Sequence, residues 1–491
     1  MKYRPLILIS IMLAMFMSAI EATIVTTALP SIAAELGGFS LYSWVFSVYL
    51  FMQAVTVPIY GKLADLYGRK PVFTFGVITF LVGSILCGFA PSMFYLIIFR
   101  FIQGLGAGAV QPIAMTIVGD IYSLEERGKI QGYLASVWGF SAIIGPTLGG
   151  FLVEFVDWSW VFWINLPIGI IALLGILVFL KEEFDKKQHK IDYVGTTLLV
   201  VFISALMAVL LRGGVTWPWL SGPIFILLFM AGFAFLLFIM QEKRAEDPLM
   251  PMWIWKYRVI LIANVVSLIT GILLMGISNF LPTFVQGVME RTPKEAGFVL
   301  AVMSIGWPIA STIASKTMMK FGFRNIAWIG TVFLILGSSL FLFLNQQNGV
   351  VFGSVGAFLV GIGMGLTNTI FTVAIQSSVE WRNRGVVTAS NMFMRMMGTT
   401  IGASLFGGII NMRMIQYLEN LQISKEMDLN LDITNNILDP DKRKELSSDV
   451  VQALQDGLTF SLHTVYLIVF ALAILSFIFV KYMPKVPTKV K

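Results

Sequence analysis

The chain has 491 residues, of which 57% are hydrophobic and 12% are charged. Soluble domains carry about twice that share of charged residues, so the composition excludes a water-soluble enzyme, a disulfide-stapled scaffold and a disordered protein. A membrane-spanning helix needs about 20 apolar residues. The composition therefore predicts an all-α polytopic membrane protein.

The first 30 residues combine a basic start with an apolar run, as a signal peptide does. The run continues to Leu29 with no clear small-residue cleavage site, so we expect a retained first span. Further apolar runs follow, bounded by charges or by Gly and Pro clusters. The fourteen predicted spans are 6–29, 42–61, 72–90, 94–119, 130–153, 159–180, 193–211, 221–240, 259–281, 295–315, 325–344, 350–378, 386–410 and 459–480.

The positions of Lys and Arg predict how the chain faces the membrane. If the N-terminus is inside, the inner segments hold 24 of the 34 basic residues and the short outer loops hold three. Basic residues gather in cytoplasmic loops, so we predict a plasma-membrane protein with both termini in the cytoplasm. The net charge of +7 then reflects orientation in the lipid bilayer, and no nucleic-acid partner is expected.

Segment 411–458 is the one long outer loop, with nine acidic residues and five basic ones. Residues 447–451 have the pattern of a helix N-cap that leads into an amphipathic stretch. A solvated outer cap is the favoured interpretation, and a catalytic domain is the alternative.

An internal repeat relates the two halves of the chain. A shift of 257 residues brings the Gly-rich segment 104–108 onto 361–365, and residues 126–128 onto 383–385. A shift of 254 brings Lys62 and Gly68 onto Lys316 and Gly322. Parallel repeats of this kind form two bundles with a site between them. We predict bundles at 1–180 and 258–480, two inserted spans with flanking loops at 181–257, and a tail at 481–491.

The loop after the second span reads GKLADLYGRKP at 61–71 and resembles the signature loop of the major facilitator superfamily. The resemblance implies two six-helix bundles and a cytoplasmic latch between them, whereas the residues alone also fit an ordinary basic loop. The implied latch residues are Gly61, Asp65, Gly68, Arg69, Lys70, Asp120 and Arg127.

Two charged residues fall inside spans of the first half. Arg100 lies about 9 Å from the outer end of its span and Glu21 about 13 Å from Pro30, at 1.5 Å per residue. Charges inside a membrane need a partner or water, so we expect these two to interact. A protonation switch and a static ion pair that fixes packing are both open.

Glu21 lies in IEATIVTTALP, which resembles a segment of the fourteen-span drug:H⁺ antiporters that usually carries Asp there. Arg100 matches the arginine of the superfamily's fourth span. The fifth span resembles the antiporter motif of exporters, with Ser141 in place of Gly, although a generic kinked helix fits as well. The motif residues are Gly132, Ser141, Gly145, Pro146, Gly149 and Gly150.

Other polar or aromatic residues are candidates for a substrate cavity, although each alone is also explained as a contact between helices. Arg395 is the most conspicuous, because it falls near the middle of a span. The candidates are Gln53, Gln103, Trp138, Asn279, Asn368, Asn391 and Arg395.

The resemblance implies a proton-coupled antiporter that exports amphipathic or cationic drug-like compounds by alternating access and works as a monomer. The alternative is an exporter or flippase of an endogenous lipid, peptide or metabolite. No phosphate-binding loop or nucleophile–histidine cluster occurs, so the chain is not expected to be an enzyme. One cysteine and two histidines predict no disulfide and no metal site. No cofactor is expected, and the proton gradient would supply the energy.

Overall fold

A computed structural model describes residues 3–36, 42–182, 192–213, 217–246, 248, 250–291, 293–347, 349–419, 443–444 and 446–484, in which helices dominate. The helices of the first half are α1 (Arg4–Leu36), α2 (Tyr42–Tyr67), α3 (Arg69–Gly88), α4 (Met93–Ile121), α5 (Leu124–Phe155), α6 (Trp160–Trp163) and α7 (Asn165–Phe179). Then follow α8 (Tyr193–Arg212) and α9 (Gly222–Arg244). The second half contains α10 (Arg258–Thr283), α11 (Pro293–Phe321), α12 (Phe323–Phe341), α13 (Gly349–Ser377), α14 (Arg384–Glu419) and α18 (Ser448–Lys481), with short 3-10 or π segments η2 (Met252–Lys256), η3 (Phe284–Val288) and η4 (Trp381–Asn383).

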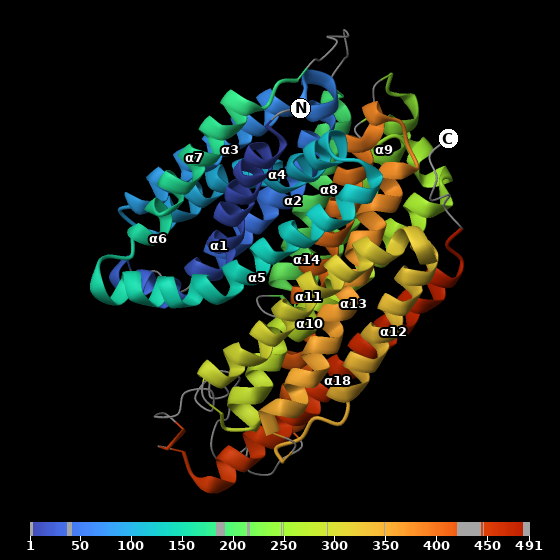
Figure 1. Cartoon of the computed structure of the whole chain (residues 1–491). Helices are drawn as coiled ribbons and strands as arrows, with labels where there is room; N and C mark the ends of the chain where they lie inside the picture. Colours follow the sequence, from blue (N-terminus) through green and yellow to red (C-terminus); the bar gives the residue numbers. More distant parts are fainter. Residues whose placement is uncertain are drawn as a thin grey trace.

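The long helices form two bundles. Helices α1–α7 pack on one another as the N-terminal bundle, and α10–α18 as the C-terminal bundle. Helices α8 and α9 pair with each other, and α8 also touches α2 and α14, so this pair lies against both bundles. Figure 1 shows the blue-to-teal and the yellow-to-red helices as two separate groups.

Matching glycines confirm the internal repeat in the packing. Gly104 and Gly106 on α4 leave no room for a Cβ against α2 and α3, and Gly361 and Gly363 on α13 do the same against α11 and α12. The repeated turn glycines also agree, since Gly68 and Gly322 both precede a helix with φ of 95° and 81°. A side chain with a Cβ rarely adopts this conformation.

Each predicted span coincides with a helix. Within the described residues, eleven helices are long and apolar enough to cross a membrane, and shorter apolar stretches lie at Val48–Val57 and Val194–Leu206. The chain is thus a multi-pass membrane protein, while fourteen crossings remain a prediction. The sixth span is divided into α6 and α7, and Pro167 lies in the first turn of α7, where a helix tolerates it.

The outer segment 411–458 differs from the expected loop at both ends. Helix α14 continues to Glu419, and α18 begins at Ser448 and runs without a break to Lys481. The predicted N-cap at Ser447 is correct in position, but its side chain makes no capping hydrogen bond. The amphipathic stretch and the last span are therefore one helix. Residues 420–442 and 445 lie outside the described part.

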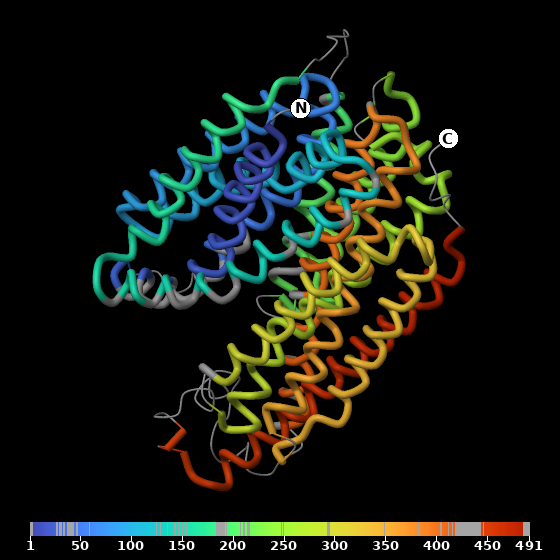
Figure 2. Tube along the Cα trace, viewed as in Figure 1, coloured from blue at the N-terminus to red at the C-terminus, as the bar shows by residue number. Residues whose placement is uncertain are grey.

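The two bundles touch near one end, where α1 begins and α18 ends, and diverge toward the other end (Figure 2). We call the touching end the inner end and the opposite one the outer end. Within the described residues, the most extensive contacts between the bundles are those of α5 with α11, α2 with α14, α4 with α14 and α5 with α13. The closest approaches involve glycines: a Cβ on Gly61 of α2 would overlap Ala389 of α14, and one on Gly132 of α5 would overlap Thr312 of α11.

Candidate functional site

The predicted latch residues lie together at the inner end. The Arg69 guanidinium pairs with Asp65, with Nη2 and Oδ1 2.9 Å apart, and with Asp120, with Nε and Oδ2 3.1 Å apart. Arg69 and Asp65 are buried. These three residues lie on α2, α3 and α4. The predicted latch therefore joins helices within the N-terminal bundle.

Asp65 also crosses to the C-terminal bundle. Its Oδ2 accepts a hydrogen bond from the backbone N–H of Val386 at 2.9 Å. Val386 lies in the first turn of α14, whose free N–H groups favour a negative charge. A Cβ on Gly385 would overlap the Asp65 carboxylate, so glycine is needed there. Asp65 therefore holds the inner end of α14 against α2.

Further contacts join the bundles beside Asp65. Arg384 donates from Nη1 to the carbonyl of Gly119 at 2.7 Å, and lies 3.7 Å from Asp120. Gln376 donates to the carbonyl of Met115 at 3.2 Å. Arg127, predicted as a latch partner, donates instead to the carbonyl of Tyr122 in its own bundle at 3.0 Å.

Two residues that contact the predicted latch, Glu182 and Trp381, were not predicted from the sequence. Glu182 accepts hydrogen bonds from the backbone N–H groups of Arg69 and Lys70, at 2.7 and 2.9 Å, and so caps α3. Trp381 of the C-terminal bundle lies under the Arg69 guanidinium, 4.3 Å from ring centroid to Cζ. Glu182 had one signal in the sequence, since it is an acid directly after the sixth span. Predicted latch residue Lys70 is bound to the carbonyls of Leu177 and Leu180.

Glu21 of α1 and Arg100 of α4 form an ion pair inside the N-terminal bundle. Both side chains are 0% exposed. Asn165, the first residue of α7, donates its side-chain N–H to the second oxygen of Glu21. The depths counted along the sequence thus correctly predicted this contact, and the structure seals it from solvent in this conformation.

The guanidinium of Arg100 has further partners that are not acids. Its Nη1 donates to Gln103 at 2.7 Å and its Nε donates to the carbonyl of Val45 at 3.3 Å. The ring of Tyr49 lies 4.2 Å from its Cζ. Gln103, expected in a substrate cavity, belongs instead to this sealed network and donates to Ser84 at 2.7 Å. The network therefore spans α1, α2, α3, α4 and α7.

Arg395 and Asn368 lie in contact in the C-terminal bundle. Nη1 of Arg395 on α14 donates to Oδ1 of Asn368 on α13 at 2.5 Å, and both residues are half-buried. One turn toward the inner end, Asn391 is buried and donates to Asn264 and Ser267 of α10, at 3.1 and 2.9 Å.

The remaining cavity candidates do not gather around this pair. Gln53 of α2 is buried, whereas Trp138 of α5 and Asn279 of α10 are exposed. The sequence thus grouped residues that the structure separates. Gln103 lies in the sealed N-terminal network, and Asn368, Asn391 and Arg395 lie on α13 and α14.

The residues predicted to form an antiporter motif lie along α5, where small residues bring neighbouring helices close. Gly145 approaches Thr23 of α1, and the hydroxyl of Thr23 donates to the Ser141 carbonyl at 3.0 Å. Gly132 approaches α11 across the bundle interface. Gly149 is buried in the same helix, while the Pro146 and Gly150 side chains lie outside the described residues. The motif thus packs α5 on both bundles.

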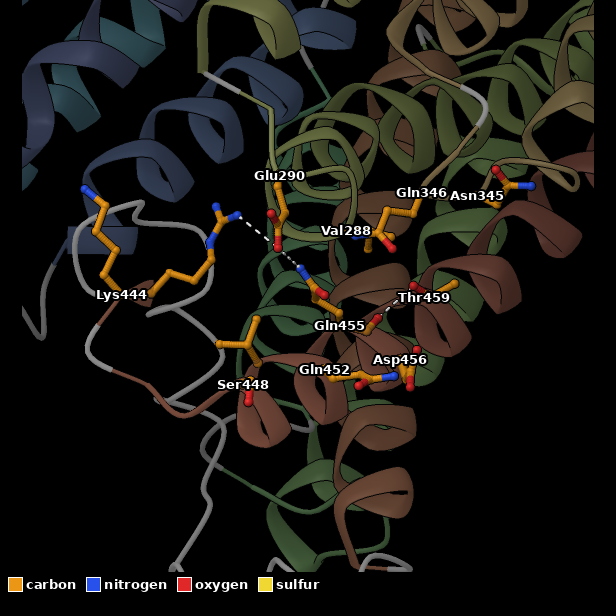
Figure 3. A pocket seen from close by; sticks show the side chains of 12 residues that line it. Val288, Glu290, Asn345, Gln346, Lys444, Ser448, Gln452, Gln455, Asp456 and Thr459 are labelled. Carbon is orange, nitrogen blue, oxygen red and sulfur yellow. Dashed lines mark hydrogen bonds and ion pairs between the residues drawn. The ribbon is translucent and has the colours of Figure 1, made fainter.

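A polar pocket of about 630 Å³ opens at the outer end of the C-terminal bundle (Figure 3). It lies between the π segment after α10, the turn after α12 and the start of α18. Glu290 has a backbone φ of 56°. Its Oε1 accepts a hydrogen bond from Nε2 of Gln455 at 2.7 Å and lies 3.6 Å from Nη1 of Arg443. The residues that line this pocket do not include Glu21, Arg100 or Arg395. Within the described residues no group of three His, Cys, Asp or Glu side chains could hold a metal.

Two apolar helix bundles that are joined at one end and carry charges in their interior define a multi-pass membrane transporter, not an enzyme. The sequence profile of the Major Facilitator Superfamily matches residues 11–241 and 191–403. The chain belongs to this superfamily.

Relatives and solved structures agree with this assignment. Multidrug resistance protein 3 of Bacillus subtilis (strain 168) is 34% identical over 489 residues, covering 98% of this chain and 96% of that protein. Multidrug transporter protein MdtP of the same organism is 34% identical over 485 residues, covering 94% and 90%. The human organic anion transporter MFSD10 shares the fold at a TM-score of 0.65 and 14% identity, covering 97% of this chain and 99% of that one. The proton:xylose symporter XylE has a TM-score of 0.65 at 12% identity, covering 99% and 97%.

Proposed function

We propose that the protein is a proton-coupled antiporter that exports amphipathic, drug-like compounds by alternating access, as a monomer in the plasma membrane with both termini in the cytoplasm. The names of the two Bacillus subtilis relatives support drug export. The observation that carries proton coupling is the buried pair of Glu21 and Arg100. Glu21 is the one acid away from the ends of the predicted spans, and such residues mark ion pathways.

Protonation of Glu21 would change how strongly Arg100 interacts with its partners on α2. A neutral Glu21 no longer balances the Arg100 guanidinium, which then depends on Gln103, Val45 and Tyr49. Val45 and Tyr49 belong to α2, and α2 carries Asp65 of the latch at its inner end. One helix, α2, therefore joins the titrating pair to the contact that closes the inner end. Proton binding would shift the balance between the inner-closed and inner-open conformations through this helix.

The closed inner end defines one half of the transport cycle. The bundles touch through Asp65, Arg384 and Gln376, and they diverge toward the outer end. The glycines at positions 61 and 385 let α2 and α14 come this close. In this conformation cargo would leave toward the outer side, and opening of the latch would admit the next molecule from the inside.

A second candidate is export of an endogenous metabolite. The Acurin A biosynthesis cluster MFS-type transporter of Aspergillus aculeatus is 31% identical over 414 residues, covering 83% of this chain and 75% of that protein. Its name links it to a biosynthesis cluster. The same latch and buried pair would serve such cargo.

Proteoliposomes with an imposed pH gradient test the proposal. Wild-type protein should accumulate a lipophilic dye against its gradient, and Glu21→Gln should abolish accumulation while dye exchange at equal pH persists. Glu35→Gln is the matched control, because Glu35 is an exposed acid at the outer end of the same helix. Full proton-driven accumulation by Glu21→Gln would exclude the coupling role. A lipid probe moved without any dye transport would favour a flippase.

A further inference from the structure

Arg395 is a deep charge that has no acid beside it among the residues that the structure describes. It lies 11 residues from the inner end of α14, or about 16 Å at 1.5 Å per residue. Within the described part of the chain, no carboxylate lies within ion-pair distance of it. Helices α10 and α13 contain no Asp or Glu, and α14 contains none before Glu419. Among the described residues, Arg395 therefore has no acid on α10 or α13, nor on α14 before Glu419, to compensate its charge.

The amide of Asn368 satisfies only part of this group. A guanidinium offers five N–H donors in a planar fork and stays protonated in proteins, and the amide oxygen at 2.5 Å accepts from Nη1. A neutral oxygen offsets less of the desolvation cost than a carboxylate does. A visiting oxyanion would find both charge and free donors here.

The seam that carries Arg395 faces the N-terminal bundle. Thr388 lies seven residues, or two turns, toward the inner end and so on the same face of α14. It accepts a hydrogen bond from Gln376 of α13 at 3.2 Å, and Gln376 also donates to the carbonyl of Met115 on α4. The seam between α13 and α14 thus meets the other bundle at its inner end, which places Arg395 on the side where alternating access requires a site.

The residues next to Arg395 suit an apolar body attached to the acid. The sequence around it reads MFMRMMG at 392–398, with Met394 and Met396 half-buried. Methionine side chains adapt to varied apolar shapes. In the N-terminal bundle Glu21 is already neutralised by Arg100. The net charge of Glu21, Arg100 and Arg395 together is therefore positive. Cationic cargo, expected from the sequence, would meet repulsion here.

We propose that Arg395, held by Asn368, binds the acidic group of the cargo, so that the preferred substrates are amphipathic carboxylates or similar oxyanions. This inference rests on the proposed export function but not on its proton coupling. The Arg395 guanidinium is well suited to this role because it pairs with a carboxylate through two parallel hydrogen bonds.

Binding measurements without a pH gradient test the charge preference. The probes are 1-pyrenebutyrate, 1-pyrenebutyramide and 1-pyrenebutylamine, which share one apolar body and differ in charge. Purified wild-type protein in lipid nanodiscs should bind the carboxylate about tenfold tighter than the amide, the size expected for a charged hydrogen bond, and the amine most weakly. Equal or tighter binding of the amide or the amine to the wild type would overturn the proposal without any variant.

Two variants assign the preference to this site. Arg395→Gln should lose the tenfold preference, and Asn368→Asp should lose it too, because a carboxylate beside Arg395 competes with the probe. Arg413→Gln, on the same helix near its outer end, should keep it, and an unchanged preference in Arg395→Gln would overturn the proposal. Glu21→Gln should bind all three probes as the wild type does. A failure of proton coupling would therefore be distinguishable from a failure of anion recognition.

Discussion

Arg100 of the N-terminal bundle and Arg395 of the C-terminal bundle both lie deep in helices. Arg100 has a carboxylate beside it, whereas Arg395 has none among the described residues. Arg100 is 0% exposed and is bound by side chains or carbonyls of several helices, while Arg395 is half-buried and has one amide partner. The buried Glu21–Arg100 pair has no net charge, which suits a carboxyl group that binds or releases a proton when water gains access to it. A lone cation at the seam suits a group that pairs with something brought from outside.

The internal repeat sharpens this difference. The shift of 257 residues that aligns the two halves places Arg395 on Trp138 and Arg100 on Ala357. The backbone positions correspond, as the paired glycines show, yet each half carries its charge at a place where the other has an apolar residue. The two bundles thus share a packing scheme and divide the chemistry between them.

The largest expected effect comes from removing each arginine in turn. Arg100→Met leaves Glu21 as an unpaired buried charge and should lower stability by about 3–5 kcal/mol. Arg395→Met removes an uncompensated charge and should leave stability unchanged or raise it. Thermal unfolding of both variants in the same detergent measures the contrast.

A double variant controls for packing. Glu21→Gln with Arg100→Met removes both charges and should recover most of the loss, because a buried pair is replaceable when neither partner is left alone. Equal destabilisation by Arg100→Met and Arg395→Met would contradict the comparison, since it would mean that Arg395 has a counter-charge in the folded protein.

The next effect concerns Asp65, past the inner end of its predicted span. Burial raises the pKa of Asp65 to about 7, although the neighbouring Arg69 and the Val386 N–H favour the carboxylate. A raised pKa means that the closed latch binds the proton more tightly than a hydrated Asp65 does. Its contribution to closure is therefore fully present in acid and is lost as the pH rises through about 7.

Spin labels measure that pH dependence directly. Labels on Lys129 of α5 and Phe321 of α11, both exposed at the inner end, should report a closed inner end that opens as the pH rises from about 4 to about 7, the interval between the ordinary pKa of an Asp and the raised pKa of Asp65. Asp65 alone should change the ratio of closed to open by at most about tenfold per pH unit, the limit for one proton. Asp65→Asn should weaken this response, and Asp120, the other carboxylate paired with Arg69, should account for what remains. A closed fraction that grows with rising pH would contradict the sign.

The sequence predicted the parts of these sites that depend on periodicity and on motif spacing. Counting helical rise placed Glu21 and Arg100 at one depth, and the structure has them in contact. The resemblance of loop 61–71 implied that Asp65 and Arg69 belong to one latch, and the structure pairs them across the turn at Gly68 that separates α2 from α3. The first prediction rests on the fixed rise of a helix, and the second rests on the resemblance of the loop to a family motif.

Contacts that cross between bundles could not be predicted in the same way. The partner of Asp65 is a backbone N–H of Val386, and a backbone group leaves no residue-specific mark in the sequence. Glu182 likewise binds two backbone N–H groups, which leave no mark in the sequence. Gln103 was wrongly assigned to the cavity because its burial depends on how five helices pack. Arg395 was singled out, but its missing counter-charge became clear only when the neighbouring helices were known.

The smallest effect should come from the exposed counterpart of the deep pair, at the outer pocket. Arg443 and Glu290 lie 3.6 Å apart with the Glu290 side chain 46% exposed, so water screens their attraction and Arg443→Ala should cost less than about 1 kcal/mol. The small loss should shrink further in high salt, whereas the loss in Arg100→Met should not, because buried charges are screened far less. Thermal unfolding of both variants at low and high salt separates the two cases. A loss in Arg443→Ala as large as in Arg100→Met would mean that the outer pocket is closed to water, and that burial alone does not set the N-terminal pair apart.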